Sequence, residues 1–233
     1  MSSLRDKEVI VAGGSGGIGS AVTALLLEEG ARVIVSYRAN RERAEVWKDR
    51  AAVLQADLAM PDDRTRLLDA AAGLYALVVL AGTPARSEAA MQESHDINYL
   101  GPILLAREAA TRMKAAGTHG AIVVTSTMQA NALFPGSTAY AAQKAALQHA
   151  ARILAKECRG PSNIRVNVVS PGVTAAGMAE ASIASGKYDR FVQDGIIPRF
   201  ARAGDIARGV RFLLEPDNYI TGQVLCIDGG MTL

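Results

Sequence analysis

The sequence contains few of the residue types that bind metals or form disulfides. Among its 233 residues there are two cysteines, Cys158 and Cys226, and three histidines, His95, His119 and His149. All five are isolated, and their spacing matches neither a zinc motif nor a disulfide framework. The sequence therefore predicts no metal site and two free thiols.

Long hydrophobic runs and clusters of one charge sign are also missing. No apolar run approaches the ~20 residues that span a membrane, and the charged N-terminus has no apolar signal core. The formal net charge is +2, and the basic residues are spread along the chain instead of forming a patch for nucleic acid. We therefore expect a soluble, cytoplasmic protein that binds neither membrane nor nucleic acid.

Hydrophobic residues are abundant, at 49%, and occur in short runs that alternate with helical stretches. The alternation predicts one α/β domain over residues 1–233, a doubly wound, mainly parallel sheet of about seven strands with helices on both faces. Segment 174–187 is rich in Ala, Gly and Ser, and we expect a mobile substrate lid over about 174–200. The expected strands are 9–12, 32–37, 52–56, 74–80, 121–125, 165–169 and 223–227, and the expected helices are 20–29, 41–48, one opening at 61–63, about 93–116, 138–157 and 205–214.

A glycine-rich turn, residues 13–19, joins the first predicted strand to the first predicted helix. Glycines let the backbone bend sharply and approach a pyrophosphate, and the helix N-terminus then presents free N–H groups and a partial positive charge. A plain flexible turn is the alternative, but the position between a strand and a helix favours dinucleotide binding. The expected contacts are Gly13, Ser15, Gly16, Gly17, Ile18 and Gly19.

The end of the second predicted strand carries Tyr37 and Arg38 and no carboxylate. A carboxylate there would accept hydrogen bonds from a ribose 2′-OH and would repel a 2′-phosphate. Arg38 can pair with that phosphate, so the sequence favours NADPH over NADH, unless Arg38 is a solvated surface residue. After the third strand, Asp57 can accept from the adenine amino group and Leu58 can pack on the ring, or Asp57 can cap the next helix.

Tyr140 and Lys144 lie four residues apart on a predicted helix and share one face. A nearby ammonium group lowers the tyrosine pKa from its ordinary value of about 10 toward the working pH, which suits proton transfer. Most Tyr-x-x-x-Lys pairs are ordinary helix surface. Here, however, the hydroxyl cluster 125–127 ends the fifth strand, where open α/β sheets place ligands, and Asn98 is a polar amide within a packed helix.

Together these motifs resemble the short-chain dehydrogenase/reductase family over nearly the whole chain. Residues 167–172 resemble the family segment beside the nicotinamide, and 220–223 with 227–230 resemble its C-terminal ending, as in the 3-oxoacyl-carrier-protein reductase branch. The resemblance implies a Rossmann-type fold and NADPH-dependent reduction of a ketone or 3-oxoacyl carbonyl to an alcohol. It also implies a homo-oligomer, a tetramer or a dimer.

The resemblance gives each site residue a role. Tyr140 would protonate the carbonyl oxygen, Lys144 would lower the Tyr140 pKa and hold the nicotinamide ribose, and Asn98 would bind a relay water. Thr127 stands where the family has its catalytic serine, with Ser126 as the alternative. Further cofactor contacts would come from Ala81, Gly82, Pro171, Gly172 and Val173.

Three departures from the family pattern leave a second hypothesis open, a regulatory or nucleotide-binding module with reduced catalysis. Threonine replaces the serine, Val79 and Leu80 replace two amides, and Ala176 stands where threonine is usual. The retained Tyr140 and Lys144 argue for an enzyme acting on a small carbonyl or alcohol, because binding alone does not need this pair.

Overall fold

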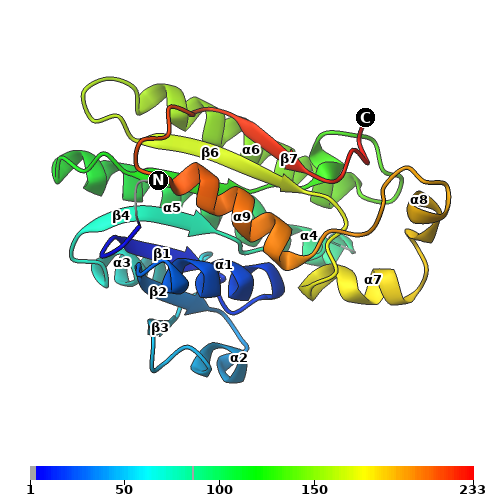
Figure 1. The fold of residues 1–233 in the computed structure, drawn as a ribbon, viewed down its shortest axis with the longest axis horizontal. Coiled ribbons are helices and arrows are strands. Elements are labelled where there is room, and N and C mark those ends of the chain that lie inside the picture. Colours follow the sequence, from blue (N-terminus) through cyan, green and yellow to red (C-terminus); the bar gives the residue numbers. More distant parts are fainter. Residues whose placement is uncertain (1–3, 86) are drawn as a thin grey trace.

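The structure, a computed structural model, describes residues 4–85 and 87–233. Seven parallel strands form one sheet in the order β3-β2-β1-β4-β5-β6-β7 (Figure 1). The doubly wound α/β fold is thus confirmed, and the predicted strands differ from the observed ones only at their ends. The strands are β1 (Glu8–Ala12), β2 (Arg32–Tyr37), β3 (Ala52–Gln55), β4 (Leu74–Val79), β5 (Ala121–Thr125), β6 (Arg165–Pro171) and β7 (Val224–Ile227).

Helices cover both faces of this sheet. One face packs against α1 and α9 and the other against α3, α5 and α6, so β4, β5 and β6 are buried along their whole length, as parallel strands between two helical layers must be. The helices are α1 (Gly17–Glu28), α2 (Arg41–Glu45), α3 (Pro61–Asp69), α4 (Glu88–His95), α5 (Gly101–Ala115), α6 (Thr138–Glu157), α7 (Glu180–Ala184), α8 (Asp189–Gln193) and α9 (Ala203–Leu214), with short turns η1 (Asp96–Leu100), η2 (Met128–Ala130) and η3 (Gly177–Ala179).

The long helix predicted over about 93–116 is present but begins earlier, at Glu88, and is not a regular α-helix throughout, because the π turn η1 stands between α4 and α5. Pro102 gives the physical reason: its nitrogen cannot donate to the carbonyl of Asn98, and its ring would clash with that carbonyl in a regular helix. A π turn accommodates the misfit, and the N–H of Gly101 bonds to the carbonyl of Asp96 instead. This wider turn carries the fully buried Asn98 to the loop that follows β4.

The carboxyl ends of the strands lie at one edge of the sheet, and the chain changes its winding direction between β1 and β4. Open sheets of this kind bind ligands at such a switch point. Residues 174–200, with η3, α7 and α8, project beyond this edge (Figure 1). The lid segment, as we call residues 174–200, buries Tyr188 and Ile197 against Met128, Val173 and Met231.

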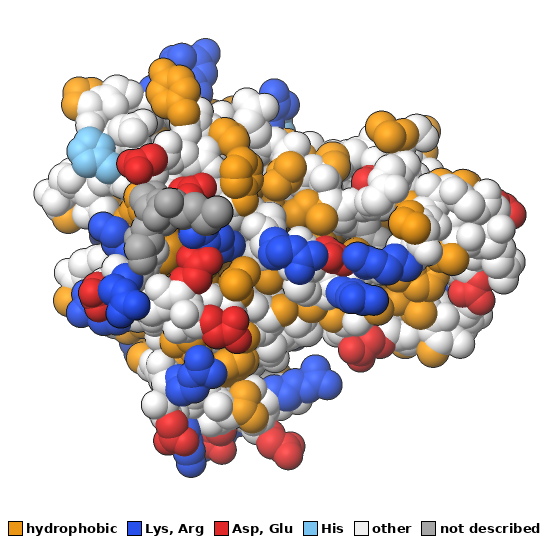
Figure 2. Space-filling view, viewed as in Figure 1, with side chains coloured by type: hydrophobic (Ala, Val, Ile, Leu, Met, Phe, Trp, Pro, Cys, Tyr) orange, Lys and Arg blue, Asp and Glu red, His pale blue; other side chains and the backbone are white. Residues whose placement is uncertain are grey.

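Across the described residues, no helix is both long enough and apolar enough to span a bilayer. On the face of the molecule shown in Figure 2, acidic and basic side chains are interspersed.

Candidate active site

A cavity of about 750 Å³ lies at the carboxyl edge of the sheet and reaches from the glycine turn to the lid segment. Most of the predicted site residues line it, although they come from four strand ends and two helices. These lining residues are Gly13, Gly16, Gly17, Ile18, Gly19, Ala81, Gly82, Thr127, Tyr140, Lys144, Pro171, Gly172 and Val173.

The glycine turn fits a phosphate group. Gly13 has φ +82°, and a Cβ on Gly19 would lie 2.1 Å from the Gly13 carbonyl oxygen, so both positions require glycine. The first turn of α1 has no side-chain cap and no acidic residue. Its leading N–H groups therefore lack intrahelical partners and can donate to an anion.

Tyr140 and Lys144 both line the cavity from α6, but their pKa values do not shift as predicted. The buried Lys144 ammonium donates to the carbonyls of Ala81, at 3.3 Å, and Thr125, at 3.0 Å. Burial lowers the pKa of Lys144 to about 8 and raises the pKa of Tyr140 to about 12. The expected lowering of the Tyr140 pKa is not observed, because desolvation dominates over the neighbouring charge. At neutral pH the phenol keeps its proton and can donate it.

The three hydroxyls of residues 125–127 have different surroundings. Ser126 Oγ is buried, 3.1 Å from the Lys144 carbonyl oxygen and 3.1 Å from Gln148 Oε1, so it is used in holding α6. Thr127 Oγ1 accepts a long hydrogen bond, 3.4 Å, from the N–H of Gln129 and keeps its proton for a ligand. Thr125 Oγ1 is buried without a hydrogen-bond partner in the described part of the chain. Thr127 is therefore better placed than Ser126 to bind a carbonyl oxygen.

Asn98 does not line the cavity and is held by protein groups. Its Nδ2 donates to the carbonyl of Thr83 and to Gln143 Oε1, both at 2.8 Å, and its Oδ1 accepts from the N–H of Thr83 at 2.8 Å. Gln143 Nε2 donates in turn to Ser94 Oγ, at 3.0 Å. The side-chain amide thus fixes the loop after β4 to α6, and the relay water stays a prediction.

Five predicted cofactor residues lie outside the cavity lining: Ser15, Tyr37, Arg38, Asp57 and Leu58. Leu58 belongs to the hydrophobic core, and Asp57 Oδ1 accepts from the N–H of Ala59, at 3.0 Å, within its own loop. Arg38 forms an exposed ion pair with Glu93, at 3.4 Å. Contacts from these five residues to the adenosine part of a cofactor stay predictions.

The cavity also contains three cationic residues that sequence reasoning missed. Arg43 of α2 lies at the end near the glycine turn, and Lys187 and Arg190 come from the lid segment. Arg43 has a sequence signal, because it follows the second strand closely, as Arg38 does. The two lid residues have none, since nothing in the sequence shows which side of a short helix faces a cavity.

Comparisons with known proteins agree with this geometry. A family model described as Enoyl-(Acyl carrier protein) reductase matches residues 12–232. The chain is 31% identical to NADPH-dependent aldehyde reductase 2, chloroplastic, of Arabidopsis thaliana, over 99% of this chain and 95% of that protein.

Two solved structures cover the chain almost completely. A short chain dehydrogenase/reductase family protein is 33% identical, with a TM-score of 0.86 and coverage of 98% of both chains. The structure of ElxO with NADP bound is 25% identical, with a TM-score of 0.86, and covers 97% of this chain and 98% of that chain.

Proposed function

The chain belongs to the short-chain dehydrogenase/reductase family of oxidoreductases, and on this premise we propose that it is an NADPH-dependent carbonyl reductase with Tyr140 as its general acid. One observation carries the proposal. Tyr140, Lys144 and Thr127 line the same cavity as the glycine turn and the uncapped N-terminus of α1. A proton donor, a hydroxyl and an element suited to phosphate thus line one cavity, an arrangement that a nucleotide-binding module alone does not need.

The residues present fit a nicotinamide dinucleotide. The close approach of Gly19 to Gly13 leaves a cradle that any side chain would fill, and residues 171–173 line the other end of the same cavity. NADPH is favoured because the Arabidopsis relative is an NADPH-dependent aldehyde reductase and the ElxO structure has NADP bound. Arg38 and Arg43 also follow the end of β2 closely. A bound NADPH would supply the hydride.

The chain's own residues would handle the proton and the developing charge. The half-buried Tyr140 phenol, with its pKa raised to about 12, stays protonated at neutral pH and donates to the carbonyl oxygen as negative charge forms there. The Thr127 hydroxyl donates a hydrogen bond to the same oxygen. Lys144, held by two backbone carbonyls, places its positive charge beside the site and stabilises the phenolate that remains.

Substitution of Tyr140 by phenylalanine tests this assignment. Removal of the general acid should lower kcat for ketones and 3-oxo esters by about 10²–10⁴-fold, while the NADPH dissociation constant should change little. Turnover is followed by loss of NADPH absorbance and binding by fluorescence. Tyr219→Phe is the matched control, since Tyr219 is fully exposed. Turnover unchanged in Tyr140→Phe would remove Tyr140 from the mechanism, and NADPH binding without turnover of any carbonyl by the unmodified protein would favour the regulatory module.

We also propose that the protein is a cytoplasmic homo-oligomer, a tetramer or a dimer. The two long helices carry partly exposed apolar side chains, Leu104 on α5 at 38% exposure and Ile153 on α6 at 48%. Burial of such residues between subunits would remove apolar surface from water. Light scattering coupled to size-exclusion chromatography tests this, and a monomer at micromolar concentration would exclude it.

A further inference from the structure

The charges around the cavity are all of one sign. Its lining includes four cationic residues, Arg43, Lys144, Lys187 and Arg190, and, among the described residues, no aspartate or glutamate. The face of the molecule shown in Figure 2 differs, since acidic and basic side chains are interspersed on it. A cavity with only positive charges attracts anions and repels cations.

A dinucleotide would use two of these cations but not the other two. Arg43 lies by the glycine turn, and Lys144 is bound to two carbonyls beside Tyr140. Lys187 and Arg190 come from the lid segment, on either side of Tyr188, where the cavity is also lined by Phe134 and Phe191. These two cations therefore lie in the part of the cavity left for a substrate.

Lys187 and Arg190 are also not neutralised by acidic neighbours. None of the ion pairs in the described part of the chain includes either residue. Lys187 Nζ lies 5.3 Å from the centre of the Tyr188 ring, and the Arg190 guanidinium lies 5.1 Å from the centre of the Phe191 ring. An aromatic face positions a cation without cancelling its charge, so both keep their capacity to bind an anion.

Two acidic side chains of the lid segment, those of Glu180 and Asp189, lie close to glycines of the lid itself. Glu180 Oε1 accepts from the N–H of Gly177 at 3.0 Å, and the carboxylate of Asp189 lies beside Gly186. Two other arginines behave differently, because Arg199 at the end of the lid segment and Arg208 of α9 are both paired with Asp205. Unlike these two arginines, Lys187 and Arg190 line the cavity and have no carboxylate partner among the described ion pairs.

From these observations we propose that the substrate is a carbonyl compound bearing an anionic group, a carboxylate or a phosphate, which Lys187 and Arg190 bind. This inference rests on the proposed carbonyl reductase function. The carbonyl would lie at Tyr140 and Thr127, and the anion would reach the lid across the apolar surface of Phe134 and Phe191. Binding of the anion would also draw the lid segment toward the sheet, since both cations belong to it.

Matched substrates with and without the anionic group test the inference. We would measure kcat/KM with NADPH for 3-oxobutanoate, 4-oxopentanoate and 5-oxohexanoate and for their methyl esters, and for dihydroxyacetone phosphate against dihydroxyacetone. At least one anion should exceed its neutral counterpart by about tenfold, which corresponds to one or two ion pairs at a partly exposed site. The preference should fall as salt is added, because salt screens such pairs. The acid series and the phosphate pair distinguish a carboxylate from a phosphate.

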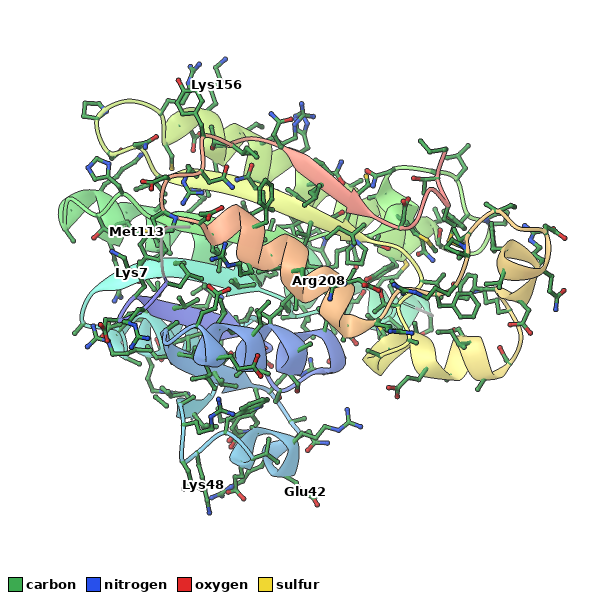
Figure 3. The ribbon with its side chains drawn as sticks, viewed as in Figure 1. Lys7, Glu42, Lys48, Met113, Lys156 and Arg208 are labelled. Atoms are coloured by element: carbon green, nitrogen blue, oxygen red, sulfur yellow. The ribbon has the colours of Figure 1, made fainter. Side chains whose placement is uncertain are left out.

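The double variant Lys187→Gln/Arg190→Gln tests whether these two lid residues cause the preference for anionic substrates. The ratio of kcat/KM for the anion to that for the neutral compound should fall about tenfold in this variant. It should stay at its original value in Lys156→Gln, since Lys156 lies at the far end of α6, away from the lid segment (Figure 3). The unchanged melting temperature of the double variant would show that it remains folded.

The outcomes separate this inference from the proposed function. If every neutral compound is turned over with a kcat/KM equal to or higher than that of its anionic counterpart, only the proposal of an anionic substrate is overturned. The same holds if the preference for the anion survives in the double variant. Absence of turnover for every compound, with NADPH still bound, would overturn the carbonyl reductase function and this inference together.

Discussion

Replacement of Lys144 by methionine removes a charge that the folded protein buries almost completely. The side chain of Lys144 has 2% of its surface exposed, and burial lowers its pKa from 10.5 to about 8. Methionine has nearly the same length and no charge. The variant therefore isolates how the ammonium group contributes to stability, apart from any effect on catalysis.

The size of the effect on the free energy of unfolding follows from the proton that Lys144 loses when the protein folds. Between pH 8 and 10.5 the unfolded chain binds a proton that the folded protein has lost, so the free energy of unfolding rises with pH through this window. Each pKa unit is worth about 1.4 kcal/mol, which gives about 3 kcal/mol over the window. At neutral pH the full penalty for the buried charge is present. The variant lacks this penalty but leaves two carbonyl acceptors without a donor, a loss of about 1–3 kcal/mol.

Urea unfolding at about pH 7 and about pH 10 measures the difference in unfolding free energy between the unmodified protein and Lys144→Met. Relative to the variant, the unmodified protein should gain about 2–3 kcal/mol of unfolding free energy across this interval. All other titrating groups are common to both proteins and cancel. Lys156→Met removes an exposed lysine of the same helix. Its unfolding free energy should differ from that of the unmodified protein by the same amount at both pH values. If the difference in unfolding free energy for Lys144→Met is also the same at both pH values, burial does not lower the pKa of Lys144.

Three further predictions concern the cofactor and the hydroxyls. Arg43→Ala and Arg38→Ala should each weaken NADPH by about tenfold more than NADH in calorimetric titrations, and equal losses for both cofactors would refute a 2′-phosphate role. Gly19→Ala should abolish NADPH binding and lower the melting temperature, because its Cβ would meet the Gly13 carbonyl oxygen at 2.1 Å; binding that persists would contradict the cradle. Thr127→Ala should lower kcat by about 10²-fold, whereas Ser126→Ala should mainly reduce stability, by about 1 kcal/mol; the reverse pattern would make Ser126 the carbonyl ligand.

Much of the fold was predictable because the sheet is parallel and covered on both faces. Strands such as β4, with the sequence Leu-Tyr-Ala-Leu-Val-Val, must be apolar at every position in this arrangement, so short apolar runs mark them reliably. The glycine turn was predictable for a similar reason, because Gly13 and Gly19 tolerate no side chain. In both cases the constraint on the side chain appears directly in the sequence, as an apolar run or as glycine.

Features that depend on distant parts of the chain were not predictable in the same way. The pKa of Tyr140 depends on how deeply α6 is buried, which the Tyr-x-x-x-Lys spacing does not reveal. Likewise, Leu58 enters the core because Gly101 of α5 allows its backbone within 2.5 Å of the position that a Cβ would take. The cavity-facing positions of Lys187 and Arg190 depend on the folding of the whole lid segment.

The π turn η1 has a cause that is visible in the local sequence and a consequence that depends on distant parts of the chain. Pro102 is a local signal that a regular helix cannot continue, yet its consequence appears on the far side of the turn, where Asn98 reaches Thr83 and Gln143. Because Gln143 precedes Lys144 on α6, this contact couples the loop after β4 to the helix that carries the proton-transfer pair. The carbonyl of Ala81, in the same loop, then accepts from Lys144. A proline in one helix thus helps to set the position of an ammonium group on another, through an amide that needs no contact with the ligand.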